Sequence, residues 1–314
     1  MVYVGEPDSL DGDGVVAELT ALLGSVSTPE RAVHEKRYLK SDLEHIGASV
    51  PDVRRVTRRA LRDRVANDRA ATVEFAQALW DRPVHELRLA AALALAERQA
   101  LLGPEDLPLL ERLLREARTW AIVDVLAPSV AGPIVARHPE ASRTLERWSR
   151  DEDLWLRRSA LLAYLLPMRR GEPVFDAFAA LADPLLEDTE FFVRKAIGWV
   201  LRERTKKAPE EVHAWLMPRR RRASRLTLRE ASKNRGLCAP SFWATEADWG
   251  RPEAGPRTRG ARPTGVDGHL ASAPPAAPYS LTRLQALSTA RLRLATCPRA
   301  AAAAASASRA RSAS

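Results

Sequence analysis

The stretch "ELRLAAALAL" (Glu86–Leu95) contains the pattern that decides the fold: an apolar residue, then an arginine, then a run of small and apolar residues. The same order recurs in "DVRRV" (52–56), "WLRRSALLAYL" (155–165), "FVRKAIGWVL" (192–201) and "TLREAS" (227–232). The repeated arginines are Arg54, Arg88, Arg157, Arg194 and Arg229, at intervals of 34, 69, 37 and 35 residues. Because 69 is close to two periods, one repeat lacks its arginine, and Val123–Asp124 stands at that place.

A period of about 35 residues indicates pairs of helices stacked into a solenoid. From Val15 to Lys233 the chain is rich in Ala, Leu, Arg and Glu, with apolar residues at helical spacing and with Pro and Gly between the runs. These features predict an all-α fold, an α-solenoid superhelix of about six HEAT-like repeats. We place the folded domain at residues 15–235, after a disordered N-terminus at 1–14.

The repeated arginine is predicted to be structural, linking adjacent repeats through hydrogen bonds or ion pairs. Asp124 is the exception, because it puts a carboxylate where the other repeats have a cation. In an apolar helix such as "TWAIVDVLA" (119–127), a buried carboxylate costs several kcal/mol unless it is paired or used. Asp124 therefore needs a partner or a function.

The charge of the chain is unevenly distributed. Of 314 residues, 49 are Lys or Arg and 40 are Asp or Glu, a net charge of +9. Residues 236–314 contain ten Arg and four acidic residues, which leaves 39 − 36 = +3 for residues 1–235. A nucleic-acid site in the domain must therefore come from basic residues gathered on one face.

Residues 236–314 differ from the domain in composition. This Ala-, Pro-, Arg- and Ser-rich segment has too little apolar content to bury a core, and we expect it to be disordered. It also holds both cysteines, Cys238 and Cys297, so that cysteine ligation of zinc and disulfides are excluded for the domain. The histidines show no metal-ligand spacing, and we expect no metal and no cofactor.

The acidic start of the chain lacks the features of a signal peptide, and the longest apolar run, around "LAAALALAE", is expected to be too short to span a bilayer. We expect a cytoplasmic, monomeric protein that associates with the nucleoid when it is bound to DNA, with no membrane partner.

Large aromatic residues recur beside charged ones at helical spacing. Trp120 shares a helix face with Asp124, and Trp155 shares one with Arg158. A further face combines Lys195, Trp199 and Arg202. Stacked repeats would gather these residues into a groove that is aromatic, basic and singly acidic, which suits a nucleic-acid backbone with a reacting centre beside it.

The chain from about Val15 to Lys233 resembles the HEAT-like-repeat DNA glycosylases of the AlkD type. The resemblance rests on the segments "RYLKSDLEHIGASVPDVRR", "LWDRPVHELRLAA", "DEDLWLRRSALL", "EFFVRKAIGWVLRE" and "LTLREASK", of which the segment around Trp199 is the most specific. It implies a monofunctional enzyme that releases alkylated purines such as 3-methyladenine and 7-methylguanine from duplex DNA, without flipping the base.

The resemblance also implies roles for individual residues. Trp120, Asp124 and Trp199 match the trio that lines the lesion. Tyr38, Arg158 and Arg202 match residues that contact DNA, and Lys195 is predicted to join them. The chain departs from the family pattern at Thr119 and Ala121, where a Trp and an Asp are frequent, and at Leu166, where a lysine is expected. These departures are expected to weaken DNA binding or to change the lesion preference.

The implied chemistry is consistent with these residue types. Alkylation at N3 or N7 makes a purine cationic and a good leaving group. A carboxylate then stabilises the oxocarbenium-like cation that develops on the sugar. Each tryptophan face adds about 0.5–2 kcal/mol through cation–π contact.

A purely structural interpretation remains open for each residue. In this interpretation Asp124 pairs with Arg88 or Arg157 of a neighbouring repeat. Trp199 then lies in the core, as we expect for Trp80, Trp148 and Trp215. Under this interpretation the chain is a catalytically inactive HEAT-like scaffold that binds DNA or protein on its concave face.

Overall fold

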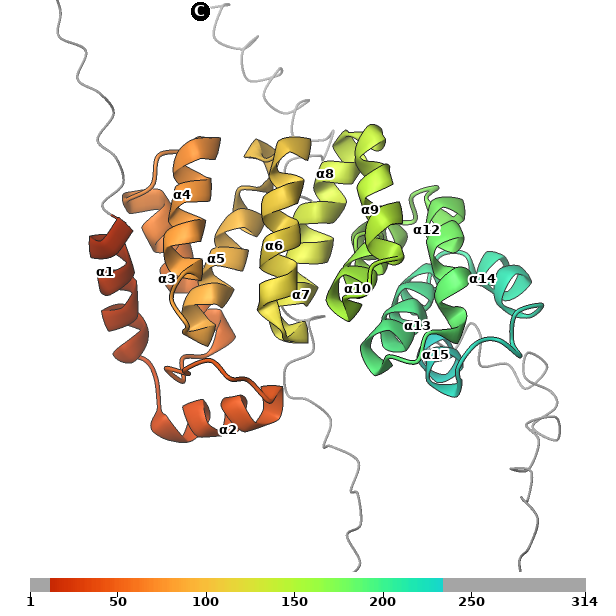
Figure 1. The fold of residues 1–314 in the computed structure, drawn as a ribbon, viewed down its shortest axis with the longest axis horizontal. Coiled ribbons are helices and arrows are strands. Elements are labelled where there is room, and N and C mark those ends of the chain that lie inside the picture. Colours follow the sequence, from red (N-terminus) through yellow and green to blue (C-terminus); the bar gives the residue numbers. More distant parts are fainter. Residues whose placement is uncertain (1–11, 234–314) are drawn as a thin grey trace, which may run out of the picture. The chain divides into compact units, whose positions relative to one another are not determined.

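The computed structural model describes residues 12–233, and this part of the chain is helical (Figure 1). Its only β-type pairing is an isolated bridge between Glu44 and Val84. The α-helices are α1 (Gly12–Gly24), α2 (Pro29–Leu39), α3 (Val50–Asp63), α4 (Arg69–Trp80), α5 (His85–Glu97), α6 (Leu107–Ala117), α7 (Trp120–Leu126), α8 (Gly132–Arg137), α9 (Ser142–Ser149), α10 (Leu154–Leu162), α11 (Leu165–Arg170), α12 (Phe175–Ala182), α13 (Phe191–Thr205), α14 (Pro209–Leu216) and α15 (Arg225–Ala231).

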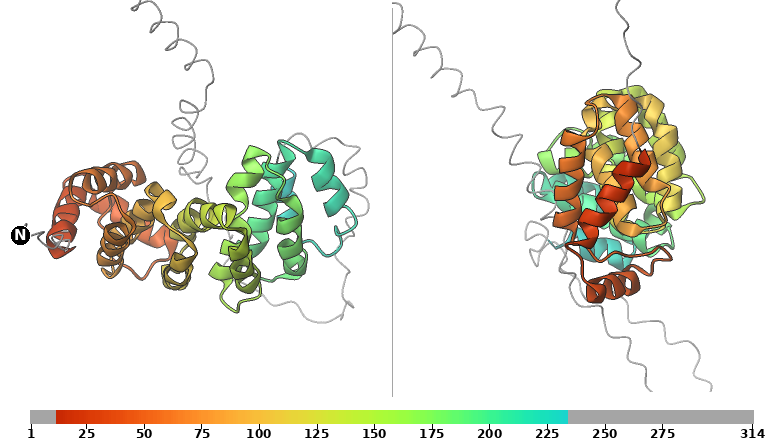
Figure 2. Two further views of the ribbon diagram at one scale, coloured as in Figure 1. Left: turned by 90° about the horizontal axis from the view of Figure 1, so that it is seen from above. Right: turned by 90° about the vertical axis from the view of Figure 1, so that its left-hand side faces the viewer.

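The helices form two rows. An inner row contains α3, α5, α7, α10, α13 and α15, in which each helix packs against the next, and α4, α6, α9 and α14 each pack against an inner helix. Helix α2 lies outside both rows, at the foot of the molecule in the right-hand view of Figure 2. The predicted all-α solenoid is confirmed, and the register positions all fall on the inner row.

Four of the six inner helices, α3, α7, α10 and α15, start where a short polar side chain accepts a backbone N–H. Ser49 caps α3, Asp153 caps α10 and Ser224 caps α15. Such caps satisfy N–H groups that have no partner within the helix. The polar residues before these four helices therefore help to set where the helices begin, whereas α5 and α13 start without a side-chain cap.

Polar contacts repeat with the sequence period. Arg137 donates to the carbonyl oxygen of Leu102 at 2.8 Å, 35 residues away. Arg69 donates to Asp106 at 3.0 Å across 37 residues, and Arg169 to Glu203 at 2.9 Å across 34. One period along the chain is thus one step along the stack, and long arginine side chains link consecutive steps.

Three of the register arginines are structural, whereas the buried Nε of Arg54 has no hydrogen-bond partner among residues 12–233. Arg88 donates to the carbonyl oxygens of Trp80 and Glu116, which end α4 and α6. Arg157 donates to Asp188 at 2.8 Å, and Arg194 donates to the carbonyl oxygen of Asp188. Arg229 is exposed, because in the described part of the chain no helix follows α15.

Trp80 and Trp148 are core residues, as predicted, and acidic residues of α6 complete their burial. The Nε1 atom of Trp80 donates to Glu116 at 2.6 Å, and that of Trp148 donates to Glu111 at 2.9 Å. Trp215 is half-buried and packs edge-on against Phe175, 6.1 Å between ring centres. Acidic residues of one repeat thus hold the indole groups of its neighbours.

We expect Glu111→Gln to lower the free energy of unfolding at pH 7 by about 1–3 kcal/mol, the usual contribution of hydrogen bonds to a charged group. Hydrogen bonds from Arg147, Trp148 and Arg115 outweigh burial and hold the pKa of Glu111 at about 2, below its ordinary value of 4.5. Because the folded state lowers this pKa, the added stability is present above pH 4.5 and is lost as the pH falls toward 2. Urea unfolding at pH 7 and pH 3 measures both effects, and a stability difference that is independent of pH would contradict them.

The run Trp120–Arg137 continues through α7, a π-helical turn at Ala127–Ala131 and α8. Pro128 lies in this turn, where its missing N–H and its ring disfavour a regular α-helix. The run is long and apolar enough for a membrane span, with a mean hydropathy of 1.3 over 18 residues, so the expectation that no apolar run is long enough was wrong. However, 61% of it is buried inside the molecule, as in a core helix.

The folded region starts earlier than predicted. Helix α1 begins at Gly12, inside the segment 1–14 that was expected to be disordered. Asp13 in its first turn favours the helix start and forms an ion pair with Arg82. Residues 1–11 and 234–314 lie outside the described residues, and so does the predicted disorder of 236–314.

Candidate active site

Helix α7 begins at the residues that depart from the family pattern. Thr119 is the N-cap of α7, and its hydroxyl accepts the backbone N–H of Ala121 at 3.4 Å. Trp120 is the first helical residue and is half-buried, and Asp124 follows one turn later. Thr119 therefore serves a local purpose, because it fixes the start of the helix that carries the Trp–Asp pair.

Asp124 forms a buried ion pair with Arg158 of the next inner helix. Nε and Nη2 of Arg158 donate to the two carboxylate oxygens, both at 2.8 Å. The two side chains are 3% and 2% exposed. A bidentate pair of this kind fixes the carboxylate in one orientation and compensates its charge. The predicted alternative partners, Arg88 and Arg157, are bound elsewhere.

Arg158 also reaches forward to α13. Its Nη1 donates to the carbonyl oxygen of Phe192 at 2.6 Å, and its guanidinium lies 5.7 Å from the centre of the Phe192 ring. One side chain thus connects α7, α10 and α13. In this structure the charge of Asp124 and the carbonyl oxygen of Phe192 hold the guanidinium of Arg158 inside the molecule, so that it does not face outward as the predicted contact with the DNA backbone would require.

Trp120 meets Tyr38 at the edge of this cluster. The two rings are 6.0 Å apart between centres and nearly perpendicular. Tyr38 comes from α2, is 41% exposed, and stacks on His34 on its other side. The lone outlying helix thus places an aromatic ring against the tryptophan of the candidate site.

Three predicted residues lie along one side of α13. Lys195 is half-buried, with its Nζ 5.5 Å from the centre of the Phe191 ring. Burial lowers its pKa, and among the charges that act on it are those of Glu230, Arg158 and Asp124. Arg202, two turns later, donates to Glu230 at 3.0 Å. Lys195 is therefore an electrostatic neighbour of the Asp124–Arg158 pair.

Trp199 lies between Lys195 and Arg202 on α13 and is 8% exposed. Its Nε1 is buried and has no hydrogen-bond partner among residues 12–233. The preceding residue, Gly198, allows close approach of α15, because a Cβ there would lie 2.7 Å from the carbonyl oxygen of Thr227. Trp199 thus lies on a closely packed part of α13, and its Nε1–H group is a hydrogen-bond donor without a partner among residues 12–233.

A groove of about 770 Å³ opens beside the start of α7. Its walls include Lys40, Arg88, Arg118 and Trp155, together with acidic residues such as Glu152. Lys40 and Arg118 are the two non-glycine residues with positive φ in the described part of the chain, at 50° and 46°. Such backbone conformations are uncommon and cluster at functional sites.

Sequence reasoning missed Lys40 and Arg118 as groove residues, whereas it had placed Trp155 in a groove. Lys40 and Arg118 are the C-caps of α2 and α6, positions that sequence spacing alone leaves undetermined by one or two residues. Trp155 was noted for its spacing from Arg158, and the structure places its ring against that of Phe192, 5.0 Å between centres.

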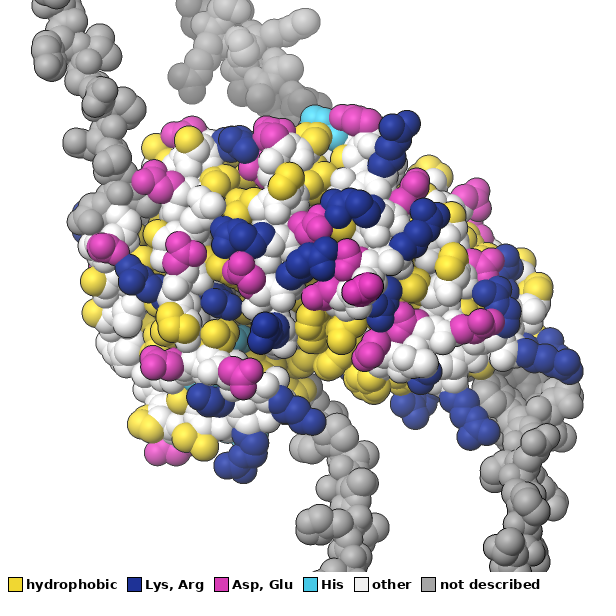
Figure 3. Space-filling model, viewed as in Figure 1, with side chains coloured by type: hydrophobic (Ala, Val, Ile, Leu, Met, Phe, Trp, Pro, Cys, Tyr) yellow, Lys and Arg dark blue, Asp and Glu magenta, His cyan; other side chains and the backbone are white. Residues whose placement is uncertain are grey.

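The space-filling view shows the surroundings of the site. In Figure 3, hydrophobic side chains reach the surface between α2 and α13 at the lower edge of the view, with Lys and Arg side chains on both sides. Tyr38 and Phe191, on these two helices, are among the exposed large hydrophobic residues. An apolar strip between cations fits a polyanion that carries flat aromatic groups.

The structure brings together some of the predicted residues and separates others. Asp124, Arg158 and Lys195 form one electrostatic cluster, and Trp120 lies against Tyr38. Trp199 and Arg202 continue along α13 from Lys195. Nothing in these contacts tests the catalytic and DNA-binding roles that were predicted for these residues, which remain predictions.

Fold and site together define an all-α repeat protein with a charged aromatic site on its inner helices. The family model described as "DNA alkylation repair enzyme" matches residues 19–234. The chain belongs to this family. Among curated proteins, none matches the sequence significantly.

Solved structures share the fold at low sequence identity. A predicted DNA alkylation repair enzyme from Enterococcus faecalis superposes with a TM-score of 0.58 at 22% identity, over 66% of this chain and 95% of that one. AlkD2 from Streptococcus mutans superposes with a TM-score of 0.52 at 17% identity, over 71% of this chain and 98% of that one. At such identities the likeness concerns the fold alone.

Proposed function

We propose that this protein is a DNA glycosylase that hydrolyses the N-glycosidic bond of cationic alkylated purines in duplex DNA. The observation that carries the proposal is the buried carboxylate of Asp124, which is fixed by Arg158 and lies one turn after Trp120 on the same helix. Membership in the DNA alkylation repair family supports DNA as the partner. The chemical class of lesion follows from what such a site is able to do.

A cationic purine is a good leaving group and needs little acid catalysis. When the bond between C1′ and the base nitrogen breaks, both electrons go to the base, which becomes neutral, and positive charge develops on the sugar. Water then adds to C1′ and releases a proton. A fixed negative group stabilises this charge without having to reorient during the reaction.

The Asp124 carboxylate retains acceptor capacity in its ion pair. Each carboxylate oxygen has two lone-pair sites, and Arg158 uses one on each oxygen. The remaining sites are available to the sugar cation or to the attacking water. In this proposal Arg158 is a positioning residue, and the aromatic faces of Trp120 and Trp199 contact the cationic nucleotide.

The test is base release from duplex DNA that has been methylated at purine nitrogens. We expect the wild-type chain to release 3-methyladenine and 7-methylguanine, detected by chromatography, and to release nothing from unmethylated duplex. Abasic sites should match the released bases in number. Absence of release above the spontaneous rate would overturn the proposal.

The same reaction tests monofunctionality. A lyase step needs an amine that attacks C1′, and Lys195 is the half-buried amine near Asp124, with its pKa lowered by burial. We propose that Lys195 contacts the DNA backbone instead. Strand breaks should therefore appear only after treatment with alkali. Breaks without alkali, or trapping of the chain on DNA by borohydride, would show a lyase.

A second function is favoured by the same ion pair. An inactive scaffold predicts that Asp124 pairs with an arginine of a neighbouring repeat, as it does with Arg158. Under this alternative the wild-type chain binds duplex DNA but releases no base. Binding measured alongside base release therefore separates the two functions.

A further inference from the structure

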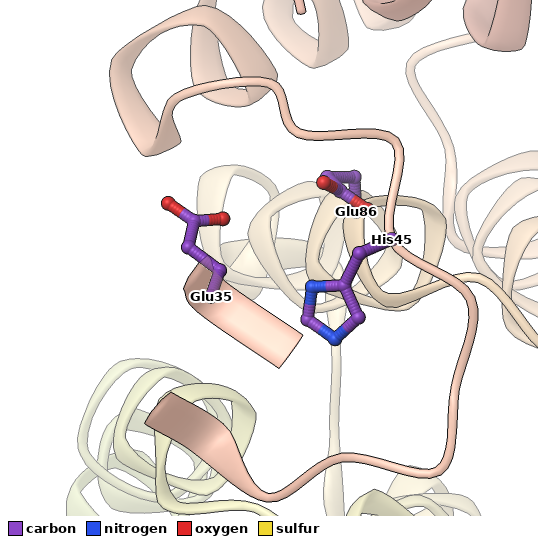
Figure 4. Close-up of side chains that lie close together, drawn as sticks. All are labelled: Glu35, His45 and Glu86. Carbon is purple, nitrogen blue, oxygen red and sulfur yellow. The ribbon is translucent and has the colours of Figure 1, made fainter. Parts of the chain in front are cut away.

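A second cluster of titratable side chains lies between α2 and α5, apart from the site described above. Glu35 of α2, His45 of the following loop and Glu86 of α5 each direct one ligand atom into a space where these atoms lie within 4.8 Å of one another (Figure 4). Glu86 is distant in sequence from Glu35 and His45, and the three side chains meet because α2 and the loop after it pack against α5.

The histidine of this cluster has no polar partner. Both ring nitrogens of His45 are buried without a hydrogen-bond partner in the described part of the chain. Its ring stacks on His85, 4.6 Å between centres, and Nδ1 of His85 is also without one. Burial and nearby Lys36 lower the pKa of His45, against the opposing effect of Glu86.

The carboxylates of Glu86 and Glu35 have different interaction partners. Glu86 is 1% exposed and accepts the backbone N–H groups of Ile46 at 3.0 Å and Gly47 at 2.6 Å. Among residues 12–233 it makes no ion pair, so its charge is buried without a compensating cation. Glu35 pairs with Arg31 at 3.2 Å, yet burial and the charge of Glu86 raise its pKa.

We propose that Glu35, His45 and Glu86 bind a divalent transition-metal ion, zinc by preference. One imidazole and two carboxylates, with a water completing the tetrahedron, form a ligand set that suits zinc. The backbone N–H groups of Ile46 and Gly47 orient Glu86 as supporting partners. This site is contrary to the expectation from sequence that the chain has no metal.

The ligand atoms need only a small adjustment. Zinc–ligand bonds of about 2.0–2.2 Å in a tetrahedron place two ligand atoms roughly 3.4 Å apart. Ligand atoms that now lie up to 4.8 Å apart must therefore approach by up to about 1.4 Å. Helix α2 can supply this movement because it has no buried residue. The ion would then join α2 to α5 and hold Tyr38 in its contact with Trp120.

The experiment titrates Zn²⁺ into the full-length chain after removal of metals by a chelator. We expect the wild type to bind one more equivalent than Glu35→Gln or His45→Ala, in which affinity at this site falls at least about tenfold. Glu35→Gln keeps the shape of the side chain, and circular dichroism checks the fold. His138→Ala, at an exposed His–Glu pair, is the matched control. Every variant retains Cys238 and Cys297, so zinc bound there is common to all.

A second measurement follows α2 itself. Zinc should slow cleavage by trypsin at the exposed Lys36, Arg37 and Lys40 in the wild type and in His138→Ala, but not in Glu35→Gln or His45→Ala. Equal zinc binding by the wild type and Glu35→Gln would overturn the site, and stronger binding of Mg²⁺ than of Zn²⁺ would overturn the class of cation. Zinc binding without protection of α2 would overturn the structural role.

Discussion

An Asp124→Asn variant is expected to lose base release by about 10²–10³-fold, the usual cost of removing one electrostatic group that acts on the transition state. Asparagine has nearly the shape of aspartate but lacks its charge, so the sugar cation is no longer stabilised. Binding to undamaged duplex DNA should change little, because phosphate contacts dominate it.

Two controls make this prediction specific. Asp176→Asn removes an exposed carboxylate of α12 and should leave base release unchanged. Asp124→Asn leaves the buried guanidinium of Arg158 without a compensating charge and is expected to destabilise the domain, so base release is compared at a temperature at which thermal unfolding shows the variant to be folded. If Asp124→Asn releases bases at the wild-type rate, the proposed catalytic role of the carboxylate is wrong, and the scaffold function is favoured.

Removal of Arg158 is expected to have the largest effect on stability. Arg158→Met should lower the free energy of unfolding by about 3–5 kcal/mol, because it leaves Asp124 buried without a compensating charge. The change also removes the hydrogen bond to the carbonyl of Phe192, which ties α10 to α13. Urea unfolding of the full-length chain measures the loss.

The double variant Asp124→Leu with Arg158→Met separates charge from packing. Replacing both members of a buried ion pair by apolar residues is often nearly neutral, so the double variant should recover most of the lost stability while remaining inactive in base release. Arg157→Met is a comparison at the adjacent arginine, which pairs with Asp188. A loss below about 1 kcal/mol in Arg158→Met would show that the buried pair adds little.

Several features of the site could be predicted from the sequence. The helical spacing put Trp120 and Asp124 on one face, and the period of about 35 residues marked Asp124 as an exception among the register arginines. The sequence also indicated that Lys195, Trp199 and Arg202 share one side of a helix. These inferences succeeded because they depend on geometry within one helix or on the repeat period.

The partner of Asp124 could not be predicted. Arg157 and Arg158 are neighbours in sequence, but successive residues on a helix differ in direction by about 100°. Arg157 consequently faces Asp188 in the next loop, whereas Arg158 faces back to α7. The rotation of α10 against α7 decides between them, and that rotation depends on packing around residues such as Gly132, where a Cβ would lie 2.4 Å from the carbonyl oxygen of Ala163.

By itself the sequence determined the class of fold, the repeat length and the residues that share a helix face, because these follow from local periodicity. Only the tertiary structure decided that Arg158 is buried and that Tyr38 contacts Trp120. It also decided that the side chains of Glu35, His45 and Glu86 lie close together between α2 and α5. Each of these contacts joins separate helices. Their formation depends on how the helices rotate and pack, which no spacing within a single helix specifies.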